Sequence, residues 1–169
     1  HVIECDVNIE FNPTIMNDWI NSVDALTHLY SLTFDGASRG NHGLCGAGYV
    51  IWLNKEVFHT GKKFISEKDT NNVAEYSAVI AGLEKCIELN IKNINVMGDS
   101  QLVIKQVNHE YKLKTPHLEV LYNTVIEMLT DFNNFKFSYI PRIKNVEADK
   151  LANEAINDYL LEKEVATIS

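Results

Sequence analysis

The sequence is poor in cysteine and lacks any long apolar run, and both absences narrow its class. Its three cysteines, Cys5, Cys45 and Cys86, lie far apart and form no Cys-x-x-Cys pair, which argues against a disulfide framework and against a zinc site. No apolar run approaches the roughly 20 residues that a membrane-spanning helix needs, and no signal peptide is recognisable at the start. We therefore expect an intracellular protein of the cytoplasm, the nucleus or an organelle, in a reducing compartment.

Lysine and arginine are absent from the first 30 positions, which carry five acidic residues. Residues 31–169 hold all 15 basic residues against 18 acidic ones, within a total net charge of −8. That total disfavours nucleic acid as a partner, because nucleic-acid binders usually carry a basic face. If four of the acids in residues 31–169 bind metal ions, however, the remaining surface is slightly positive, so the charge still permits such a partner.

Residues 1–27 are predicted to form an acidic strand-helix extension. Residues 2–11 alternate between apolar and polar side chains, which is typical of a strand with one buried face, and Asn12-Pro13 ends the pattern. Apolar residues then recur at helical spacing from Ile15 to Leu26. The segment shows no chemistry, and three roles stay open: it covers the sheet, mediates dimerisation, or is the tail of a larger domain.

Residues 28–162 have the pattern of one α/β domain, followed by a C-terminal tail at 163–169. Three strands joined by short links are predicted first, then strands that alternate with helices, the last helix being capped by Asn145. The predicted segments are strands at 28–35, 43–53, 57–65, 94–97 and 135–140, and helices from about 70, 100, 116 and 146. The order βββαβααβα indicates a mixed five-stranded sheet with helices on its faces.

Four carboxylates are expected at the ends of these elements. Asp35 and Asp99 each end a strand, whereas Glu75 and Asp149 lie in the first turns of two helices. The C-terminal ends of adjacent strands in an open sheet form the usual site, and the first and fourth strands can be central neighbours. Four acids without basic partners would repel one another there. Hard divalent cations would remove this repulsion, and two of them about 3.5–4 Å apart could clamp the attacking and leaving oxygens of a phosphodiester.

Each carboxylate also has an ordinary structural explanation. Asp35-Gly36 is typical of a hairpin turn, and Glu75 fits a capping box with Asn72. Asp99 could cap the helix that follows it, and Asp149 could simply favour the positive end of a helix. These explanations weaken when the four acids are taken together, because all of them are expected at one edge of one sheet.

Four short motifs occur in order along the chain. They are Asp35-Gly36-Ala37-Ser38-Arg39-Gly40-Asn41, Thr70-Asn71-Asn72-Val73-Ala74-Glu75, Gly98-Asp99-Ser100-Gln101-Leu102-Val103, and Ile140-Pro141-Arg142 with Asn145-x-x-Ala148-Asp149-x-Leu151-Ala152. Over about residues 29–162 the chain resembles type 1 ribonuclease H, and four motifs at suitable spacing make the resemblance highly specific. It implies the ribonuclease H-like fold, with a sheet of order 3-2-1-4-5 and helices on both faces.

The resemblance implies endonucleolytic cleavage of the RNA strand of an RNA–DNA hybrid with two Mg²⁺ ions, for which Mn²⁺ could substitute, leaving 5′-phosphate and 3′-hydroxyl ends. Asp35, Glu75, Asp99 and Asp149 match the four metal-binding carboxylates of the family. Asp35 and Asp99 would hold the metals most directly. Glu75 would also accept a hydrogen bond from a 2′-hydroxyl, and Asp149 would bind the metal on the water side.

The family's positions for hybrid recognition match Asn41, Asn71, Asn72 and Gln101. Neutral amides suit this role, because they can donate to and accept from 2′-hydroxyls and base edges in the minor groove. Without the resemblance, turns and helix caps would explain the asparagines equally well. Thr70 could help to grip a DNA phosphate.

Two departures from the family pattern concern substrate handling. Many members carry a flexible-loop histidine before the last aspartate, thought to assist product release, and Ser138–Lys144 contains none. Arg142 or Lys144 could contact phosphate instead. Many members also insert a basic helix after the second aspartate, whereas only Asn108–His117 lies there, with Lys112 and Lys114. We therefore predict weaker hybrid binding than in members with the full insert.

Three other functions remain open at this stage. Another nuclease or polynucleotidyl transferase of the superfamily is disfavoured by the pair Asn71-Asn72 and by Gln101, which suit 2′-hydroxyl recognition. A non-catalytic nucleic-acid-binding relative is disfavoured because all four carboxylates are present. The chain could also be the ribonuclease H domain of a retroelement or viral polyprotein. The expected partner is an RNA–DNA hybrid, with no membrane, and a monomer is expected.

Overall fold

The computed structural model describes residues 29–113 and 115–168. The predicted extension at residues 1–27 and the predicted contact residue Lys114 lie outside them. The elements are, in chain order, β1 (Tyr30–Arg39), β2 (Gly43–Leu53), β3 (Glu56–Asp69), α4 (Asn71–Glu88), β4 (Asn93–Gly98), α5 (Gln101–Val107), α6 (Pro116–Leu129), β5 (Asn134–Tyr139), the 3-10 turn η1 (Arg142–Lys144) and α7 (Val146–Ile168). Apart from the short turn η1, this is the predicted order βββαβααβα. Most of the segment 163–169, predicted as a tail, is the last part of α7.

The five strands of the described residues form one mixed sheet in the order β3-β2-β1-β4-β5. β1 pairs antiparallel with β2, and β2 antiparallel with β3. β4 joins β1 and β5 in parallel pairs, so each of these parallel connections needs a helical crossover. The predicted fold class and strand order are therefore confirmed.

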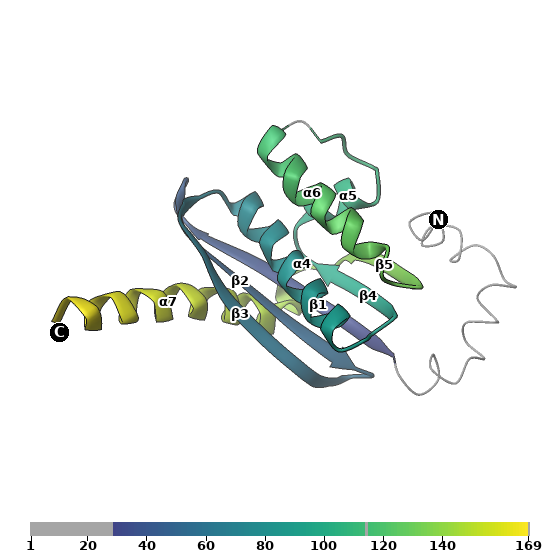
Figure 1. Cartoon of the computed structure of the whole chain (residues 1–169), viewed down its shortest axis with the longest axis horizontal. Coiled ribbons are helices and arrows are strands. Elements are labelled where there is room, and N and C mark those ends of the chain that lie inside the picture. Colours follow the sequence, from purple (N-terminus) through teal and green to yellow (C-terminus); the bar gives the residue numbers. More distant parts are fainter. Residues whose placement is uncertain (1–28, 114, 169) are drawn as a thin grey trace, which may run out of the picture.

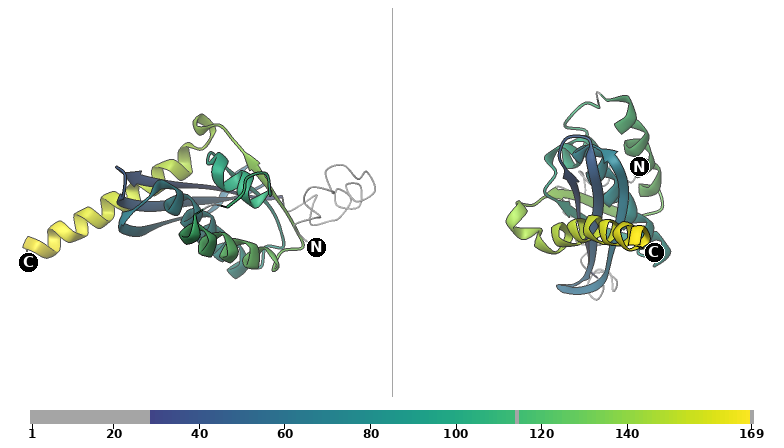
Figure 2. Two further views of the ribbon diagram at one scale, coloured as in Figure 1. Left: turned by 90° about the horizontal axis from the view of Figure 1, so that it is seen from above. Right: turned by 90° about the vertical axis from the view of Figure 1, so that its left-hand side faces the viewer.

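Helices cover the two faces of this sheet (Figures 1 and 2). α4 packs on β1 and β2, and α6 lies against α4, whereas α7 packs on β1, β2 and β3 from the other side. Every second residue of β1 faces the same layer. Leu32 and Phe34 both point toward the α4 side, where they are fully buried in the main apolar cluster. Burial of each such side chain stabilises the fold by about 1.5–3 kcal/mol.

Close contact between α7 and the sheet depends on a small residue in β2. A Cβ atom on Gly48 would collide with the backbone of α7 at Ala148 and Ala152. Gly48 is the residue that pairs with Asp35 across β1 and β2. The absence of a side chain at this position therefore lets the first turns of α7 approach β1 at the height of Asp35.

The end of β1 differs from the prediction. β1 does not end at Asp35, because β2 continues to pair with it from Gly36 to Arg39. The hairpin turn comes later and contains Gly40 and His42, whose φ angles are 86° and 61°. The interpretation of Asp35-Gly36 as the start of a tight loop was therefore wrong. Only the parallel pairing with β4 stops just before Asp35, at Phe34.

Candidate active site

Three carboxylates from three elements meet at one point of the sheet. Asp35 lies in β1, Glu75 in α4 and Asp99 directly after β4, and one oxygen of each lies within 4.8 Å of the others. The pairing of β1 with β4 ends at Phe34 and Gly98, which immediately precede the two aspartates. The separation of these two strands places both aspartates at the same height, as expected for adjacent parallel strands.

Glu75 reaches this point from the second turn of α4. Thr70 is the N-cap residue of α4, and its Oγ1 accepts a hydrogen bond from the Val73 backbone N–H at 3.3 Å. The placement of Glu75 in the first turn, and its alternative role in a capping box with Asn72, were therefore wrong. Instead, Glu75 Oε1 accepts a hydrogen bond from the Gly36 backbone N–H at 2.7 Å.

Glycine is required at position 36 for this bond. A Cβ atom there would collide with the backbone of Ala74 and Glu75. The bare backbone of β1 therefore lies directly against α4, which fixes the separation between Asp35 and Glu75.

Asp99 is also free of the capping role that its position suggested. Ser100 is the N-cap residue of α5, and its Oγ accepts a hydrogen bond from the Val103 backbone N–H at 3.3 Å. The Asp99 carboxylate is thus not used by the backbone N–H groups of α5 and can face the other two carboxylates.

Asp149 joins the group from the first turn of α7, as predicted. Its negative charge is one of the causes that raise the pKa of Asp35. One turn further along α7, Asn153 Nδ2 donates to Asp149 Oδ1 at 3.3 Å and to the Asp149 carbonyl at 3.0 Å. The fourth predicted carboxylate therefore lies on α7 and acts electrostatically on Asp35 and Glu75, and it is not one of the three whose oxygens lie within 4.8 Å of one another.

Burial and mutual repulsion dominate the electrostatics of this group. Asp35 and Glu75 are each only 5% exposed. Burial, followed by the negative charges of Glu75, Asp99 and Asp149, raises the pKa of Asp35 far above its usual range. Burial also raises the pKa of Glu75, although the hydrogen bond from Gly36 acts in the opposite direction.

No lysine or arginine forms an ion pair with these carboxylates within the described residues. Buried acids without a cationic partner are costly to ionise. A set of oxygen-only donors, within reach of one another and lacking a counter-charge, fits a hard divalent cation such as Mg²⁺ or Mn²⁺.

Asn145 lies behind the carboxylates and was predicted only as a helix cap. Its side chain is 1% exposed, and its Nδ2 donates to the Phe34 carbonyl at 2.8 Å and to Asp99 Oδ1 at 3.5 Å. Its Oδ1 is buried and meets no donor among the described residues, so this side chain does not cap α7. The motif around Asp149 contains Asn145, but a partner 111 positions away could be found only from the fold.

The predicted recognition residues lie at the ends of elements near this group. Asn41 is exposed in the β1–β2 turn, and Asn71 is the first residue of α4, followed by Asn72. The turn and the start of α4 are neighbours because Gly43 pairs with Asp69, just before the α4 cap. These asparagines come from two separate segments that the pairing brings together.

The other predicted contacts are more scattered. Gln101 is exposed as the first residue of α5, two positions after Asp99. Lys112 is exposed in the segment after α5, and Arg142 is exposed in η1. Thr70 is already engaged as the cap of α4, which leaves its backbone and the rest of its surface for a ligand.

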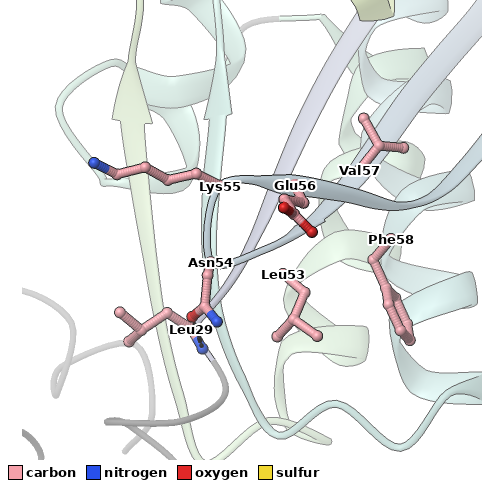
Figure 3. A pocket seen from close by; sticks show the side chains of 7 residues that line it. All are labelled: Leu29, Leu53, Asn54, Lys55, Glu56, Val57 and Phe58. Atoms are coloured by element: carbon pink, nitrogen blue, oxygen red, sulfur yellow. Dashed lines mark hydrogen bonds between the residues drawn. The ribbon is translucent and has the colours of Figure 1, made fainter.

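A hollow of about 580 Å³ lies away from the carboxylates, at the β2–β3 turn (Figure 3). It is lined by the apolar side chains of Leu29, Leu53, Val57 and Phe58 around Asn54. Leu53 pairs with the first residue of β1, five positions before Asp35. The candidate site is therefore not this hollow but the group of carboxylates further along β1, at Asp35.

Comparison with known proteins agrees with this geometry. Residues 33–155 match a family model described as reverse transcriptase-like. Ribonuclease HI of Halobacterium salinarum is 40% identical over 126 residues, which are 74% of this chain and 63% of that protein. The chain belongs to the type 1 ribonuclease H family. Bifunctional protein Rv2228c of Mycobacterium tuberculosis is 38% identical over 125 residues, or 73% of this chain.

Solved structures of this ribonuclease H family superpose closely on the chain. RNase H1 from Halobacterium salinarum gives a TM-score of 0.74 at 38% identity, covering 76% of this chain and 98% of that one. LC11-RNase H1 in complex with an RNA/DNA hybrid gives 0.74 at 34% identity, covering 78% and 99%. The chain spans only 34% of the length of Rv2228c. Among the described residues, no helix has the length and apolar character to cross a bilayer.

Proposed function

We propose that residues 28–162 form an endoribonuclease that hydrolyses the RNA strand of RNA–DNA hybrids and leaves 5′-phosphate and 3′-hydroxyl ends. The observation that supports this most is the meeting of three carboxylates within 4.8 Å, two of them buried, in a chain of the ribonuclease H family. A relative in this family has been solved with an RNA/DNA hybrid bound.

Asp35, Glu75, Asp99 and Asp149 would hold two divalent cations, Mg²⁺ or Mn²⁺. When bound, such ions supply positive charge to the attacking and leaving oxygens of a phosphodiester and make a bound water more acidic. Asp35 and Asp99 are the central ligands in this proposal. Asp149 would bind the metal ion on the side from which the attacking water approaches.

The protein's own bonds prepare Glu75 for a double role. One of its oxygens is already bonded to the Gly36 backbone N–H. This bond fixes the carboxylate orientation, so that the remaining lone pairs can face a ligand or a 2′-hydroxyl of the RNA strand. Recognition of that hydroxyl would couple binding of RNA to correct placement of the reacting phosphate.

Amide side chains from one turn and two helix starts would distinguish the strands. Asn41, Asn71, Asn72 and Gln101 would bond to 2′-hydroxyls and base edges in the minor groove of the hybrid. Thr70 would place the start of α4 against a DNA phosphate, a position favoured by the positive end of the helix.

Basic contacts to phosphate are few in this proposal. Arg142 in η1 and Lys112 with Lys114 after α5 would supply them. Because phosphate contacts carry much of the affinity for nucleic acid, we expect hybrid binding to be weak. Replacing Lys112 and Lys114 together with alanine should raise the KM for the hybrid; an unchanged KM would remove these lysines from the site.

The test is cleavage of an end-labelled RNA–DNA hybrid in Mg²⁺, beside single-stranded RNA, duplex RNA and duplex DNA. The chain should cut only the RNA of the hybrid, and Asp99→Asn should abolish the cutting. Absence of hybrid-specific cleavage by the wild type, or undiminished cleavage by Asp99→Asn, would disprove the proposed function.

A further inference from the structure

Two asparagine side chains outside the carboxylate group each donate to one member of it. Asn145 Nδ2 lies 3.5 Å from Asp99 Oδ1, and Asn153 Nδ2 lies 3.3 Å from Asp149 Oδ1. The two amides come from the start of α7 and from its second turn. They support Asp99 and Asp149, neither of which receives an ion pair from the described lysines and arginines.

Asn145 connects more parts of the site than Asn153 does. Its Nδ2 also donates to the Phe34 carbonyl at 2.8 Å, the residue just before Asp35. The backbone carbonyl of Asn145 accepts a hydrogen bond from the Asp149 backbone N–H at 3.1 Å. One residue thus contacts β1, the Asp99 side chain and the helix turn that carries Asp149.

The hydrogen bonds of the Asn145 side-chain amide are made by its NH₂ group. Both side-chain partners, the Phe34 carbonyl and the Asp99 carboxylate, are acceptors. Only the NH₂ end can bond to them, whereas the buried Oδ1 meets no donor in the described part of the chain. A buried acceptor without a partner is unfavourable. We therefore attribute the role of this side chain to the two acceptors that its Nδ2 group binds.

We propose that Asn145 and Asn153 are positioning residues that hold the Asp99 and Asp149 carboxylates in the orientation that binds divalent cations. This proposal rests on the proposed function. A neutral amide suits the task because it orients a carboxylate without cancelling its charge, whereas a lysine or arginine would compete with the metal ion. Groups that hydrogen-bond to metal ligands commonly contribute 10–100-fold to metal affinity or activity.

The chain offers a matched control on the same helix. Asn157 lies one turn beyond Asn153, and its Oδ1 accepts from Arg39 Nη2 at 2.6 Å, so it also ties α7 to β1. Its side chain forms no hydrogen bond with Asp149 or Asp99. Replacing it with alanine removes an asparagine-mediated contact between α7 and β1, in which the amide oxygen accepts, and removes no hydrogen bond to the carboxylates.

The experiment measures Mg²⁺ and Mn²⁺ binding to the substrate-free chain by calorimetry for Asn145→Ala, Asn153→Ala and Asn157→Ala. We expect at least about tenfold weaker binding for Asn145→Ala, a smaller loss of about threefold or more for Asn153→Ala, and a change below about twofold for Asn157→Ala. The Mg²⁺ concentration for half-maximal hybrid cleavage should rise by the same factors. The KM for the hybrid at saturating Mg²⁺ should stay within about twofold.

Metal affinity equal to the wild type in both variants, with only the melting temperature lowered, would overturn the proposal and leave the two residues a purely structural role. So would a wild type that binds neither ion. If Asn145→Ala does not fold, as judged by circular dichroism, the comparison of Asn153→Ala with Asn157→Ala decides. A wild type that binds metal but cuts no hybrid would refute the proposed function alone, because the calorimetry does not depend on cleavage.

Discussion

Two groups of acidic side chains within residues 29–168, one at the end of the β1–β4 pairing and one between β3 and α7, differ in burial and in partners. At the end of the β1–β4 pairing, Asp35 and Glu75 are buried, and no described lysine or arginine forms an ion pair with them. In the second group, Glu67 is exposed and accepts from Lys163 Nζ at 3.1 Å and from the Tyr159 hydroxyl. The hydrogen bonds from Tyr159 and Lys163 lower the pKa of Glu67, whereas the pKa values of Asp35 and Glu75 are raised.

Further ion pairs between β3 and α7 lie along the same surface. Lys62 Nζ lies 2.8 Å from Asp158 and 3.3 Å from Glu154, both on α7. Exposed pairs of this kind contribute little to stability because solvent screens them. The comparison teaches that burial and the lack of an ion pair, not acidity alone, distinguish Asp35 and Glu75 from the exposed acids of the β3–α7 surface, because a buried charge without a counter-charge is unfavourable.

The largest expected effect comes from neutralising one carboxylate in each region. Asp35→Asn should lower the rate of hybrid cleavage by about 10³-fold, equivalent to about 4 kcal/mol of transition-state stabilisation, because it removes a central ligand of the proposed metal site. Asp158→Asn should leave the rate within about twofold, since it loses only its exposed contact with Lys62. Initial rates on a labelled hybrid in saturating Mg²⁺ measure both. Equal losses would show that the two regions do not differ in function.

A second test uses pH and thermal stability in the presence of EDTA. Because folding raises the pKa values of Asp35 and Glu75, their contribution to stability is complete below about pH 4 and declines as the pH rises toward their folded-state pKa values. The melting temperature of the metal-free wild type should therefore fall between about pH 5 and pH 8, by roughly 3 °C or more. Circular dichroism melts measure this.

Asp35→Asn is the control for that pH dependence. It removes one of the two titrating groups, so its melting temperature should fall less over the same range and exceed that of the metal-free wild type at about pH 8. Adding Mg²⁺ should raise the melting temperature of the wild type most at the higher pH. A flat profile for the metal-free wild type would contradict the assigned burial of these charges.

The smallest effect is expected at the exposed pair. Because the pKa of Glu67 is lowered in the folded protein, its contribution is present above about pH 4.5 and is lost as the pH falls. Glu67→Gln should therefore lower the melting temperature only at neutral pH, and by no more than about 2 °C. High salt should abolish the difference. A larger or salt-independent loss would mean that this contact is not a screened surface pair.

Much of the fold could be predicted because hydrophobic periodicity and helix caps are local signals. The strand at 43–53 was predicted with its observed bounds. The end of β1 was not, because Asp35-Gly36 has turn chemistry while continued pairing with β2 is a property of the partner strand. Similarly, Thr70 and Asn72 are both good N-cap residues, and only the folded chain shows that Thr70 is used.

The candidate site was predictable in its residues and less so in its supports. The four carboxylates stand in recognisable motifs, and the structure brings Asp35, Glu75 and Asp99 together. The hydrogen bonds that orient them were not apparent, since Gly36 to Glu75 and Asn145 to Asp99 join residues 39 and 46 positions apart. Such contacts depend on the packing of helices on the sheet, which periodicity does not specify.

The bond from Gly36 to Glu75 has a spectroscopic consequence. The Gly36 N–H lies in a strand but donates to a side chain rather than to a neighbouring strand. Its NMR chemical shift should therefore follow the charge of the Glu75 carboxylate, which changes with protonation and with ligands. A single glycine amide, in the less crowded region where glycine signals fall, would serve as a built-in reporter of the state of this site.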